Sequence, residues 1–530
     1  MKLHSHKLIL IVILLIQVSC LLYFGSLKKG MHFDECFSYF NTNNSCGRQA
    51  YDRTFVSSDD IMKDFYVKKG EGFNYPFVVQ LQSYDVHPPL FYLALHTLCS
   101  FMPGTFTLWQ GLALNIFYAV ITSIFIYLSV SRYLDNKYIA LVLCFLCAIN
   151  TGTVCNVLYI RMYCLMTLFI WISIYLHIRM SEFEEFNKLE WKYVILNGAL
   201  AFLGFMTHYF YLVFLFFIEA FFWLPKLFSW KKNYKGIIKY GIGILSGGIL
   251  GVLFYPACLG QVNSGYRGQE VKSYLFDLSD FKGRLRFFGG LMNEYVYQKW
   301  IYLFLMIFVL LFLLSYYRLR KDNKLFNNVG VYFQCFLIPF LGYFLISAKC
   351  SLIGDQTMIR YQLPIYSLGI VTIGIGIYAC LKESFRSLRL KIITGVLITS
   401  LFLGFNISGI INKNVFYLYT EQEHMENVAE EYSQYPCVYI YHNEDNKYFL
   451  WNDALQLAKY EDVYFVNSNN EEKIDEVKIN SASPVVVYVS VLGSEKEDEE
   501  YLDLIFNSNS NVATSQKLYD AMNARCYLVK

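Results

Sequence analysis

Charged residues are scarce in this sequence. Only 16% of its 530 residues are Asp, Glu, Lys or Arg, whereas about a quarter is typical of soluble domains. Hydrophobic residues make up 55% and aromatic residues 18%. This composition excludes a soluble globular domain and indicates a polytopic α-helical membrane protein. The net charge of +3 decides little, because orientation depends on where the basic residues fall.

The first apolar run lacks the small-residue cleavage site of a secretory signal peptide. The run at 8–24 is followed by Lys28 and Lys29, and many further apolar runs come after it. We therefore expect an uncleaved first helix. With about 17–25 apolar residues taken as one span, the sequence predicts about eleven transmembrane helices. The predicted spans are 8–24, 108–130, 137–153, 156–178, 192–206, 209–224, 236–257, 299–316, 329–347, 361–380 and 391–411.

A regular cysteine framework is also absent. Most of the 14 cysteines lie inside apolar runs, where cysteine behaves as a small hydrophobic residue. The one CxxC, at 144–147, has no second pair near it and does not indicate a metal site. Pairing of Cys36 with Cys46, or of Cys437 with Cys526, stays open.

Lysine and arginine recur in alternate connections between the predicted spans. Such loops usually stay on the cytoplasmic side. We therefore expect a cytoplasmic N-terminus and an extracytoplasmic tail after residue 411. This orientation requires that the short apolar piece at 89–102 lies at the membrane interface and does not cross. The basic connections carry Lys2, Lys7, Arg132, Lys137, Arg179, Lys188, Lys192, Lys226, Lys231, Lys232, Lys235, Lys239, Arg318, Arg320, Lys321, Lys324, Lys382, Arg386, Arg389 and Lys391.

Residues 1–411 are accordingly predicted as one membrane domain with two large outer loops. The first loop, 25–107, is expected to carry juxtamembrane helices, and the second, 257–298, is rich in basic residues. Long loops can depart from the positive-inside tendency, so these charges do not overturn the orientation.

The tail at 412–530 has a different composition. Short apolar runs separated by polar stretches and helix-like segments predict a small extracytoplasmic α/β domain. It has no Gly-rich phosphate loop and no convincing catalytic set, so an accessory, binding or structural role is expected. The apolar runs are 437–441, 463–466 and 485–489, and the helix-like segments are 448–459 and 497–506.

The predicted orientation brings a set of ionisable and tyrosine residues to the outer ends of the spans and to the outer loops. Ionisable residues at membrane depth are costly and usually functional. Structural alternatives stay open: a solvated helix start for the acidic pair, a helix entry at His87, a polar cap for His208, and a membrane-interface anchor for Arg360 with Tyr361. Arg161 lies in an apolar stretch and needs an anionic partner. The set is Asp34, Glu35, Asp85, His87, Arg161, Tyr163, His208, Tyr209, Lys349, Arg360 and Tyr361.

These residue types suit the transfer of a group from a lipid-borne phosphate to a hydroxyl. A carboxylate can act as general base, and Arg, Lys, His and Tyr can hold a phosphate that gains charge as it leaves. No nucleotide motif is needed, and no nucleic-acid partner is expected. A transporter or flippase of lipid-linked glycans is an alternative, although its binding groups are expected near mid-span. A glycan ligase or polymerase using diphosphate-linked donors is another, favoured by arginines in the second outer loop.

Five stretches within about residues 5–410 together resemble the GT-C membrane glycosyltransferases. The similarity is greatest to the bacterial branch akin to protein O-mannosyltransferases and to the aminoarabinose transferase that modifies lipid A. HPPLFY with the acidic pair is its most specific part. The stretches are Asp34 with Glu35, YDVHPPLFYLALH at 84–96, YIRMYCLMTLF at 159–169, THYFYL at 207–212 and RYQLP at 360–364.

The resemblance implies a polyprenyl-phosphate sugar donor, inversion at the anomeric carbon, and a glycan, lipid or protein acceptor arriving from the extracytoplasmic side. It also implies an integral protein of a bacterial cytoplasmic membrane, in contact with membrane lipids. Asp34 matches the family's catalytic carboxylate, with Glu35 as its neighbour. His87 occupies a position where some relatives have a lysine that faces the donor phosphate. Four further residues match the lining of the donor phosphate or cavity: Arg161, Tyr163, His208 and Arg360.

Some relatives use a divalent metal ion and others do not. Asp34, Asp85, His87 and His208 could supply ligands, although their spacing is no metal signature.

Overall fold

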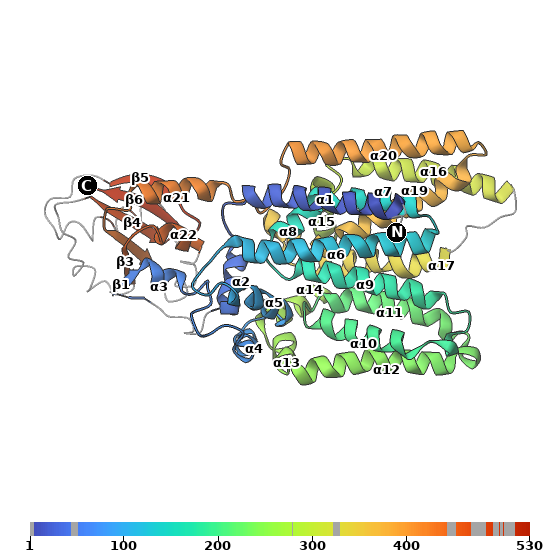
Figure 1. Cartoon of the computed structure of the whole chain (residues 1–530), viewed down its shortest axis with the longest axis horizontal. Helices are drawn as coiled ribbons and strands as arrows, with labels where there is room; N and C mark the ends of the chain where they lie inside the picture. The colour runs from blue at the N-terminus through green and yellow to red at the C-terminus, as the bar shows by residue number, and fades with distance from the viewer. Residues whose placement is uncertain are drawn as a thin grey trace. The chain divides into compact units, whose positions relative to one another are not determined.

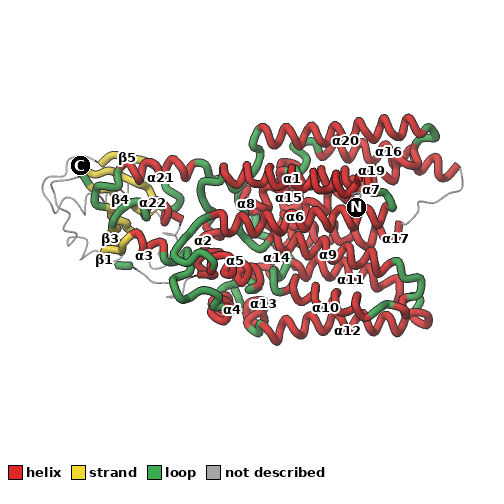
Figure 2. The backbone as a smooth tube through the Cα atoms, in the orientation of Figure 1, coloured by secondary structure: helices red, strands yellow, loops and turns green. Residues whose placement is uncertain are grey.

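The computed structural model describes residues 5–43, 51–52, 54–277, 279–321, 329–441, 452–467, 484–490, 498, 502 and 515–530. They form two compact units. The first, called the helical unit, comprises Met1–Gly25, Val79–Phe91 and Gly111–Phe416, and the second, called the sheet unit, comprises Ser26–Val78, Tyr92–Gln110 and Tyr417–Lys530. Helices make up the helical unit, whereas the strands belong to the sheet unit (Figure 2).

Long apolar helices lie side by side in the helical unit (Figure 1). Its long helices are α1 (Ser5–Leu27), α6 (Leu108–Leu134), α9 (Tyr163–Ser181), α10 (Trp191–Phe205), α11 (Tyr211–Leu227), α12 (Trp230–Phe254), α16 (Ile301–Lys321), α18 (Ile338–Cys350), α19 (Tyr366–Ser384) and α20 (Leu388–Ile411). Shorter helices connect them: α7 (Lys137–Ala148), α8 (Thr151–Leu158), α13 (Ala257–Asn263), α14 (Tyr266–Phe276), α15 (Phe281–Tyr295) and α17 (Val329–Tyr332), with a π-helical turn at Phe333–Leu337 and 3₁₀ turns η1 (Phe186–Lys188), η3 (Gln356–Tyr361) and η4 (Leu363–Ile365).

Eight helices of the described chain are long and apolar enough to cross a membrane, and a ninth span results if α7 and α8 count as one bent helix. The predicted polytopic α-helical membrane fold is thus confirmed. The two further spans predicted at 192–206 and 209–224 are present as α10 and α11, with 15 and 17 residues. Their length alone does not decide whether they cross, so the predicted count of eleven stays a prediction.

The predicted spans 137–153 and 156–178 are wrong in their boundaries. The chain instead bends by 54° between α7 and α8, and the next long helix begins only at Tyr163. The buried Asn150 causes the break. Its side chain caps α8 by accepting from Gly152 N at 2.9 Å, and it donates to Val296 O and to Asn406 Oδ1. A polar residue in an apolar run thus ends one helix and starts another.

Helices α10 and α12 approach each other through glycines. A Cβ atom on Gly247 would lie 2.2 Å from Gly198 O, and one on Gly198 would lie 2.5 Å from Gly243 O. Small residues let the two helix backbones pack closely where no hydrophobic effect drives association.

The sheet unit contains a six-stranded sheet with strand order β1-β3-β2-β4-β6-β5. Strands β2, β3 and β4 are parallel, and the other pairs are antiparallel. The strands are β1 (Thr54–Ser57), β2 (Cys437–Tyr441), β3 (Asp462–Asn467), β4 (Val485–Ser490), β5 (Ser515–Asp520) and β6 (Ala524–Val529), and the unit's helices are α2 (Phe33–Asn43), α3 (Ser58–Met62), α21 (Glu421–Glu431) and α22 (Ala454–Leu457). Helices α4 (Tyr75–Ser83) and α5 (Leu90–Ser100) each contribute residues to both units.

The three apolar runs predicted as strands in the tail are strands β2, β3 and β4, which confirms a C-terminal sheet domain. The prediction missed β5 and β6, and it missed that β1 of the first loop extends the same sheet. Of the helix-like segment predicted at 448–459, residues 448–451 lie outside the described residues, and Ala454–Leu457 is helical. The segment at 497–506 lies outside the described residues except for 498 and 502. Cys437 and Cys526 are not joined by a disulfide. Cys46 lies outside the described residues, so its pairing with Cys36 stays a prediction.

Candidate active site

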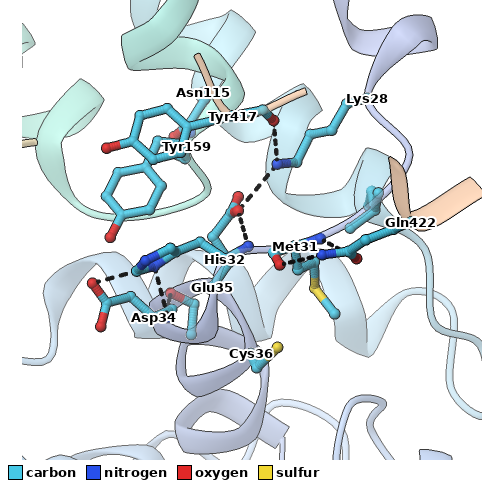
Figure 3. Close-up of polar contacts among 12 residues, drawn as sticks. Lys28, Met31, His32, Asp34, Glu35, Cys36, Asn115, Tyr159, Tyr417 and Gln422 are labelled. Carbon is cyan, nitrogen blue, oxygen red and sulfur yellow. Dashed lines mark hydrogen bonds and ion pairs between the residues drawn. The ribbon is translucent and has the colours of Figure 1, made fainter. Parts of the chain in front are cut away.

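The acidic pair occupies the first turn of α2, where negative charge is favoured by the helix dipole. Residue His32 precedes the helix, and Glu35 is its third residue. The Glu35 Oε2 atom accepts a hydrogen bond of 2.7 Å from the backbone N–H of His32 (Figure 3). This is the reciprocal half of a capping box, which satisfies a backbone donor at the helix start.

Glu35 also forms a buried ion pair. Its Oε2 lies 3.0 Å from Lys28 Nζ, and both side chains are 0% exposed. Lys28 Nζ donates a second hydrogen bond of 2.9 Å to Tyr417 O (Figure 3). Burial lowers the pKa of Lys28, and the charge and hydrogen bond of Glu35 oppose that shift. The Glu35 carboxylate is therefore the internal counter-charge of Lys28.

Asp34 has a different environment. Its side chain is 26% exposed, and its Oδ2 lies 3.6 Å from His32 Nδ1. The backbone N–H of Asp34 donates to the same Nδ1 at 3.1 Å. A nitrogen that accepts this bond carries no proton, which assigns the His32 proton to Nε2. The acidic pair thus combines one sequestered carboxylate with one that a ligand can reach.

The backbone just before the acidic pair is held by Gln422 of α21. The Gln422 side chain accepts from Met31 N and donates to Met31 O, both at 3.1 Å (Figure 3). A Cβ atom on Gly30 would lie 1.9 Å from Gln422 Oε1, so glycine is required there. Tyr417 and Tyr419 have φ of 72° and 50°, values that cost non-glycine residues energy. The sequence offered no signal for this contact, because 391 positions separate Gln422 from Met31.

A second polar group of residues lies in the helical unit. We call Asp85, His87, Arg161, Tyr163 and His208 the Arg161 cluster. They come from three places where helices are interrupted or end: the loop between α4 and α5, the turn between α8 and α9 with the start of α9, and the break between α10 and α11.

The turn that carries Arg161 is fixed by Asn115 of α6. Asn115 Nδ2 donates to Val157 O at 3.0 Å and to Tyr159 O at 2.9 Å. These carbonyls belong to the end of α8, where no helical partner is available. Arg161 itself is 4% exposed. The break before α9 thus places a guanidinium in the interior of the unit.

The members of the cluster are close to one another. His87 Nδ1 lies 3.2 Å from Asp85 Oδ2 and 3.4 Å from Arg161 Nη2. The ring of His208 has its centroid 5.7 Å from that of His87 and 5.2 Å from that of Tyr163. The sequence had predicted that these residues share a site, and the structure brings them together.

Electrostatics divide the cluster into ionised and neutral groups. Burial lowers the pKa of His208 well below 6.5, and the charges of His87 and Arg161 lower it further. Phe210 N donates to His208 Nδ1 at 3.0 Å, which leaves the ring proton on Nε2. Burial raises the pKa of Asp85, but its hydrogen bond to His87 and the charges of His87 and Arg161 outweigh burial and lower that pKa overall. Asp85 is therefore a carboxylate and His208 a neutral donor.

Gln261 of α13 supports the Asp85 loop and was not predicted. Its Nε2 donates to Asp85 O at 2.7 Å and to Gln82 O at 2.9 Å. Tyr209 donates its hydroxyl hydrogen to Gln261 Oε1. Tyr209 belongs to the set predicted at the outer ends of the spans, and its hydroxyl bonds to the residue that positions Asp85.

The remaining predicted residues lie near the break between α18 and α19. The rings of Tyr361 and Phe210 are tilted by 45° with centroids 5.8 Å apart, and the Arg360 guanidinium lies 5.2 Å from the Tyr361 ring. The side chain of Lys349 is buried, with Nζ 5.7 Å from the ring of Phe281. Tyr361 thus approaches the cluster through Phe210, whose ring lies 5.4 Å from that of His208.

The predicted ligand set does not fit a divalent metal ion. Within the part of the chain that the structure describes, no three His, Cys, Asp or Glu side chains are close enough to hold one. The Arg161 guanidinium is within hydrogen-bond distance of His87, so a cation there would meet a fixed positive charge. These residues suit an anion.

Two of the three arginines in the predicted second outer loop, Arg267 and Arg284, make local contacts. Arg267 Nη1 pairs with Glu270 Oε2 at 2.8 Å. Arg284 donates to the carbonyl oxygen of Ser351, and its guanidinium lies 4.3 Å from the ring of Tyr274. Neither contact favours a binding site for a diphosphate-linked donor.

Comparison with known proteins gives structural matches alone: no family model and no curated protein matches the sequence. The crystal structure of ArnT from Cupriavidus metallidurans bound to undecaprenyl phosphate matches with a TM-score of 0.56, over 98% of this chain and 97% of that chain, at 8% identity. The chain has the GT-C fold. ArnT is a lipid A aminoarabinose transferase, so the predicted resemblance is confirmed at the level of the fold.

Two other GT-C structures match at lower scores. ArnT from the same organism in the apo state has a TM-score of 0.47, over 93% of this chain and 96% of that chain, at 7% identity. The oligosaccharyltransferase AglB from Archaeoglobus fulgidus, in complex with an inhibitory peptide and a dolichol phosphate, has a TM-score of 0.43, over 92% of this chain and 69% of that chain, at 11% identity.

Proposed function

We propose that this protein is a membrane glycosyltransferase that moves a sugar from a polyprenyl-phosphate donor to an acceptor hydroxyl. The reaction takes place on the extracytoplasmic side of a bacterial cytoplasmic membrane, with inversion at the anomeric carbon. The acceptor is a glycan, a lipid or a protein.

The observation that carries this proposal is the Arg161 cluster within a GT-C fold. A buried guanidinium, two imidazoles and a tyrosine gather at interruptions between apolar helices. Such groups bind a phosphate by charge-assisted hydrogen bonds, and Arg161 can do so with two donors. ArnT, which shares the fold, has been crystallised with undecaprenyl phosphate.

The proposed reaction consists of one proton transfer and one displacement at the anomeric carbon. Asp34 takes the proton of the acceptor hydroxyl, whose oxygen attacks the anomeric carbon from the face opposite the phosphate. The bond between that carbon and the phosphate oxygen breaks, and the polyprenyl phosphate leaves with an additional negative charge. Arg161 and the Nε2–H of His208 stabilise this charge, with His87 and Tyr163 beside them.

Glu35 supports the reaction as a positioning residue. Its carboxylate is bound by Lys28 and by the backbone of His32, so it orders the start of α2 on which Asp34 lies. Asp34 keeps an exposed carboxylate and is the base.

A transporter is less well supported by the same geometry. Binding groups of transporters lie near the middle of discontinuous helices, whereas the Arg161 cluster lies at helix ends and in the connections between helices. The contacts of Arg267 and Arg284 likewise favour no diphosphate-linked donor.

The test is donor turnover by the purified protein. Synthetic polyprenyl monophosphates and diphosphates, each carrying different hexoses and pentoses, are offered with a membrane extract as acceptor, and release of the free polyprenyl phosphate or diphosphate is measured by mass spectrometry. We expect release from at least one monophosphate donor, with wild-type protein and not with Asp34→Asn. Turnover restricted to polyprenyl diphosphate donors, or transbilayer movement of intact donor without release, would contradict the proposal.

A further inference from the structure

The helical unit contains a second feature that the proposed reaction does not use. A cavity of about 690 Å³ lies among α7, α19 and α20, helices that pack against one another in Figure 1. Its volume is in the range of pockets that hold small organic ligands, about 300–1,000 Å³. Most of the wall is formed by Leu, Ile, Val and Phe side chains and by glycines.

The two charged residues of the wall, Lys382 and Lys391, lie at the same end of the cavity. Asn136, Tyr378, Lys382 and Lys391 lie where α7 begins, α19 ends and α20 begins. Asn136 Nδ2 donates to the Tyr378 hydroxyl at 3.2 Å, which fixes one side of this end. The opposite end, where Phe402 lies with Tyr297, Thr399 and Ser400, has no charged side chain. From Lys391 to Phe402, α20 rises about 16 Å at about 1.5 Å per residue.

This shape fits one kind of molecule. A long apolar cavity with two ammonium groups at one end complements an apolar chain that ends in an anionic headgroup. Basic pockets between transmembrane helices are where anionic lipid headgroups bind. The lysines also belong to connections that the sequence assigns to the cytoplasmic side, where anionic phospholipids are abundant.

The cavity is separate from the Arg161 cluster. Arg360 and Tyr361 precede the start of α19, whereas Lys382 lies in its last turn. From Tyr366 to Lys382 the helix rises about 24 Å. A donor whose phosphate lies at the Arg161 cluster therefore has its headgroup at the other end of these helices.

We propose that this cavity binds an anionic glycerophospholipid, with an acyl chain along α20 and the phosphate between Lys382 and Lys391. The lipid fills the space between α20 and the rest of the unit and anchors the end of α19 to the start of α20.

Native mass spectrometry tests this assignment on the full-length protein. The delipidated protein is incubated with equimolar phosphatidylglycerol and phosphatidylcholine that carry identical acyl chains. We expect preferential retention of phosphatidylglycerol, and about fivefold weaker retention for each lysine removed in Lys382→Gln and Lys391→Gln. Arg389→Gln is the matched control, because Arg389 lies two positions from Lys391 and does not line the cavity.

A second variant tests the cavity independently of charge. A Cβ atom on the lining residue Gly395 meets only Leu381 Cδ2, at 3.1 Å, so Gly395→Leu directs a side chain into the cavity. We expect this variant to lose bound lipid regardless of headgroup. Equal retention of the two lipids, an equal loss in Arg389→Gln, full retention in Gly395→Leu, or displacement of phosphatidylglycerol by polyprenyl phosphate would each overturn the proposal.

Discussion

The acidic pair and the Arg161 cluster are assembled in opposite ways. In the acidic pair, sequence neighbours differ in exposure: Glu35 is 0% exposed and bound to Lys28, whereas Asp34 is 26% exposed. In the Arg161 cluster, residues far apart in the sequence meet at interruptions between helices. The first region separates two carboxylates by burial, and the second gathers different groups into the proposed phosphate site.

These different environments suit Glu35, Asp34 and His208 to different roles. A carboxylate that is buried with its counter-ion contributes to stability, because removing one partner leaves an uncompensated buried charge. A carboxylate that stays accessible can take a proton from a substrate. A neutral His208 beside Arg161 can donate a hydrogen bond without adding another full charge.

The largest effect is expected for Asp34→Asn, which removes the proposed base and preserves the shape of the side chain. The turnover number should fall about 10²–10⁴-fold, the usual contribution of general base catalysis. The apparent unfolding temperature should not change, because the lost carboxylate is partly exposed. Asp60→Asn in α3, also an exposed carboxylate at a helix start, is the control and should keep wild-type turnover. A wild-type turnover number in Asp34→Asn would show that Asp34 is not the base.

Substitution of Arg161 should have the next largest effect on activity. Arg161→Gln removes the charge that is proposed to hold the leaving phosphate, and kcat/KM should fall about 10²–10³-fold. Arg161→Lys should recover part of that loss, because lysine restores the charge but not the planar pair of donors. Arg132→Gln, which breaks an exposed ion pair with Glu182, controls for loss of an arginine and should leave kcat/KM unchanged.

Glu35→Gln should lower stability more than activity, the opposite of what is expected for Asp34→Asn. It leaves Lys28 buried without a counter-charge, which costs about 3–5 kcal/mol of stability. We expect a lower apparent unfolding temperature, with much of the activity of the folded fraction retained. Replacement of both partners, Lys28→Met with Glu35→Leu, should recover stability because no buried charge remains. If Glu35→Gln were inactive but as stable as the wild-type protein, the result would indicate that Glu35, and not Asp34, is the base.

The smallest effect concerns pH. The pKa of His208 lies well below 6.5, so its ring stays neutral when the pH falls from about 7.5 to about 6. The lowered pKa of Asp85 keeps its carboxylate ionised over the same range. His208→Gln should therefore reduce kcat without changing the shape of the pH–rate profile. Loss of an acidic limb in this variant would show that His208 titrates during turnover.

The location of the acidic pair could be predicted from the sequence more directly than the structure around the Arg161 cluster. Asp34 and Glu35 follow an apolar helix directly, so their location was readable from local sequence. Which of the two is buried depends on Lys28 and on Tyr417, and the latter contact joins distant positions. The role of Gln422 could not be predicted either, because its side chain bonds to the backbone of Met31, which is distant in the sequence.

The helix breaks around Arg161 could not be read from hydropathy. Asn150 and Asn115 lie in apolar runs, and only their tertiary hydrogen bonds show that one ends a helix and the other holds a turn. Strand β5 was missed because it is an edge strand with mostly exposed polar residues, which lack the alternation of a half-buried strand. The parallel strands β2, β3 and β4 were predicted because buried strands have continuous apolar runs.

The most direct test of the proposed function identifies the lipid that the protein binds. Asp34→Asn should bind the donor but not consume it, so lipid extracted from this purified variant is analysed by tandem mass spectrometry beside the wild-type protein. The proposed function predicts a sugar linked through one phosphate to a polyprenol in Asp34→Asn, and free polyprenyl phosphate in the wild-type protein. A diphosphate-linked glycan, or the absence of any polyprenyl phosphate species from both proteins, would contradict it.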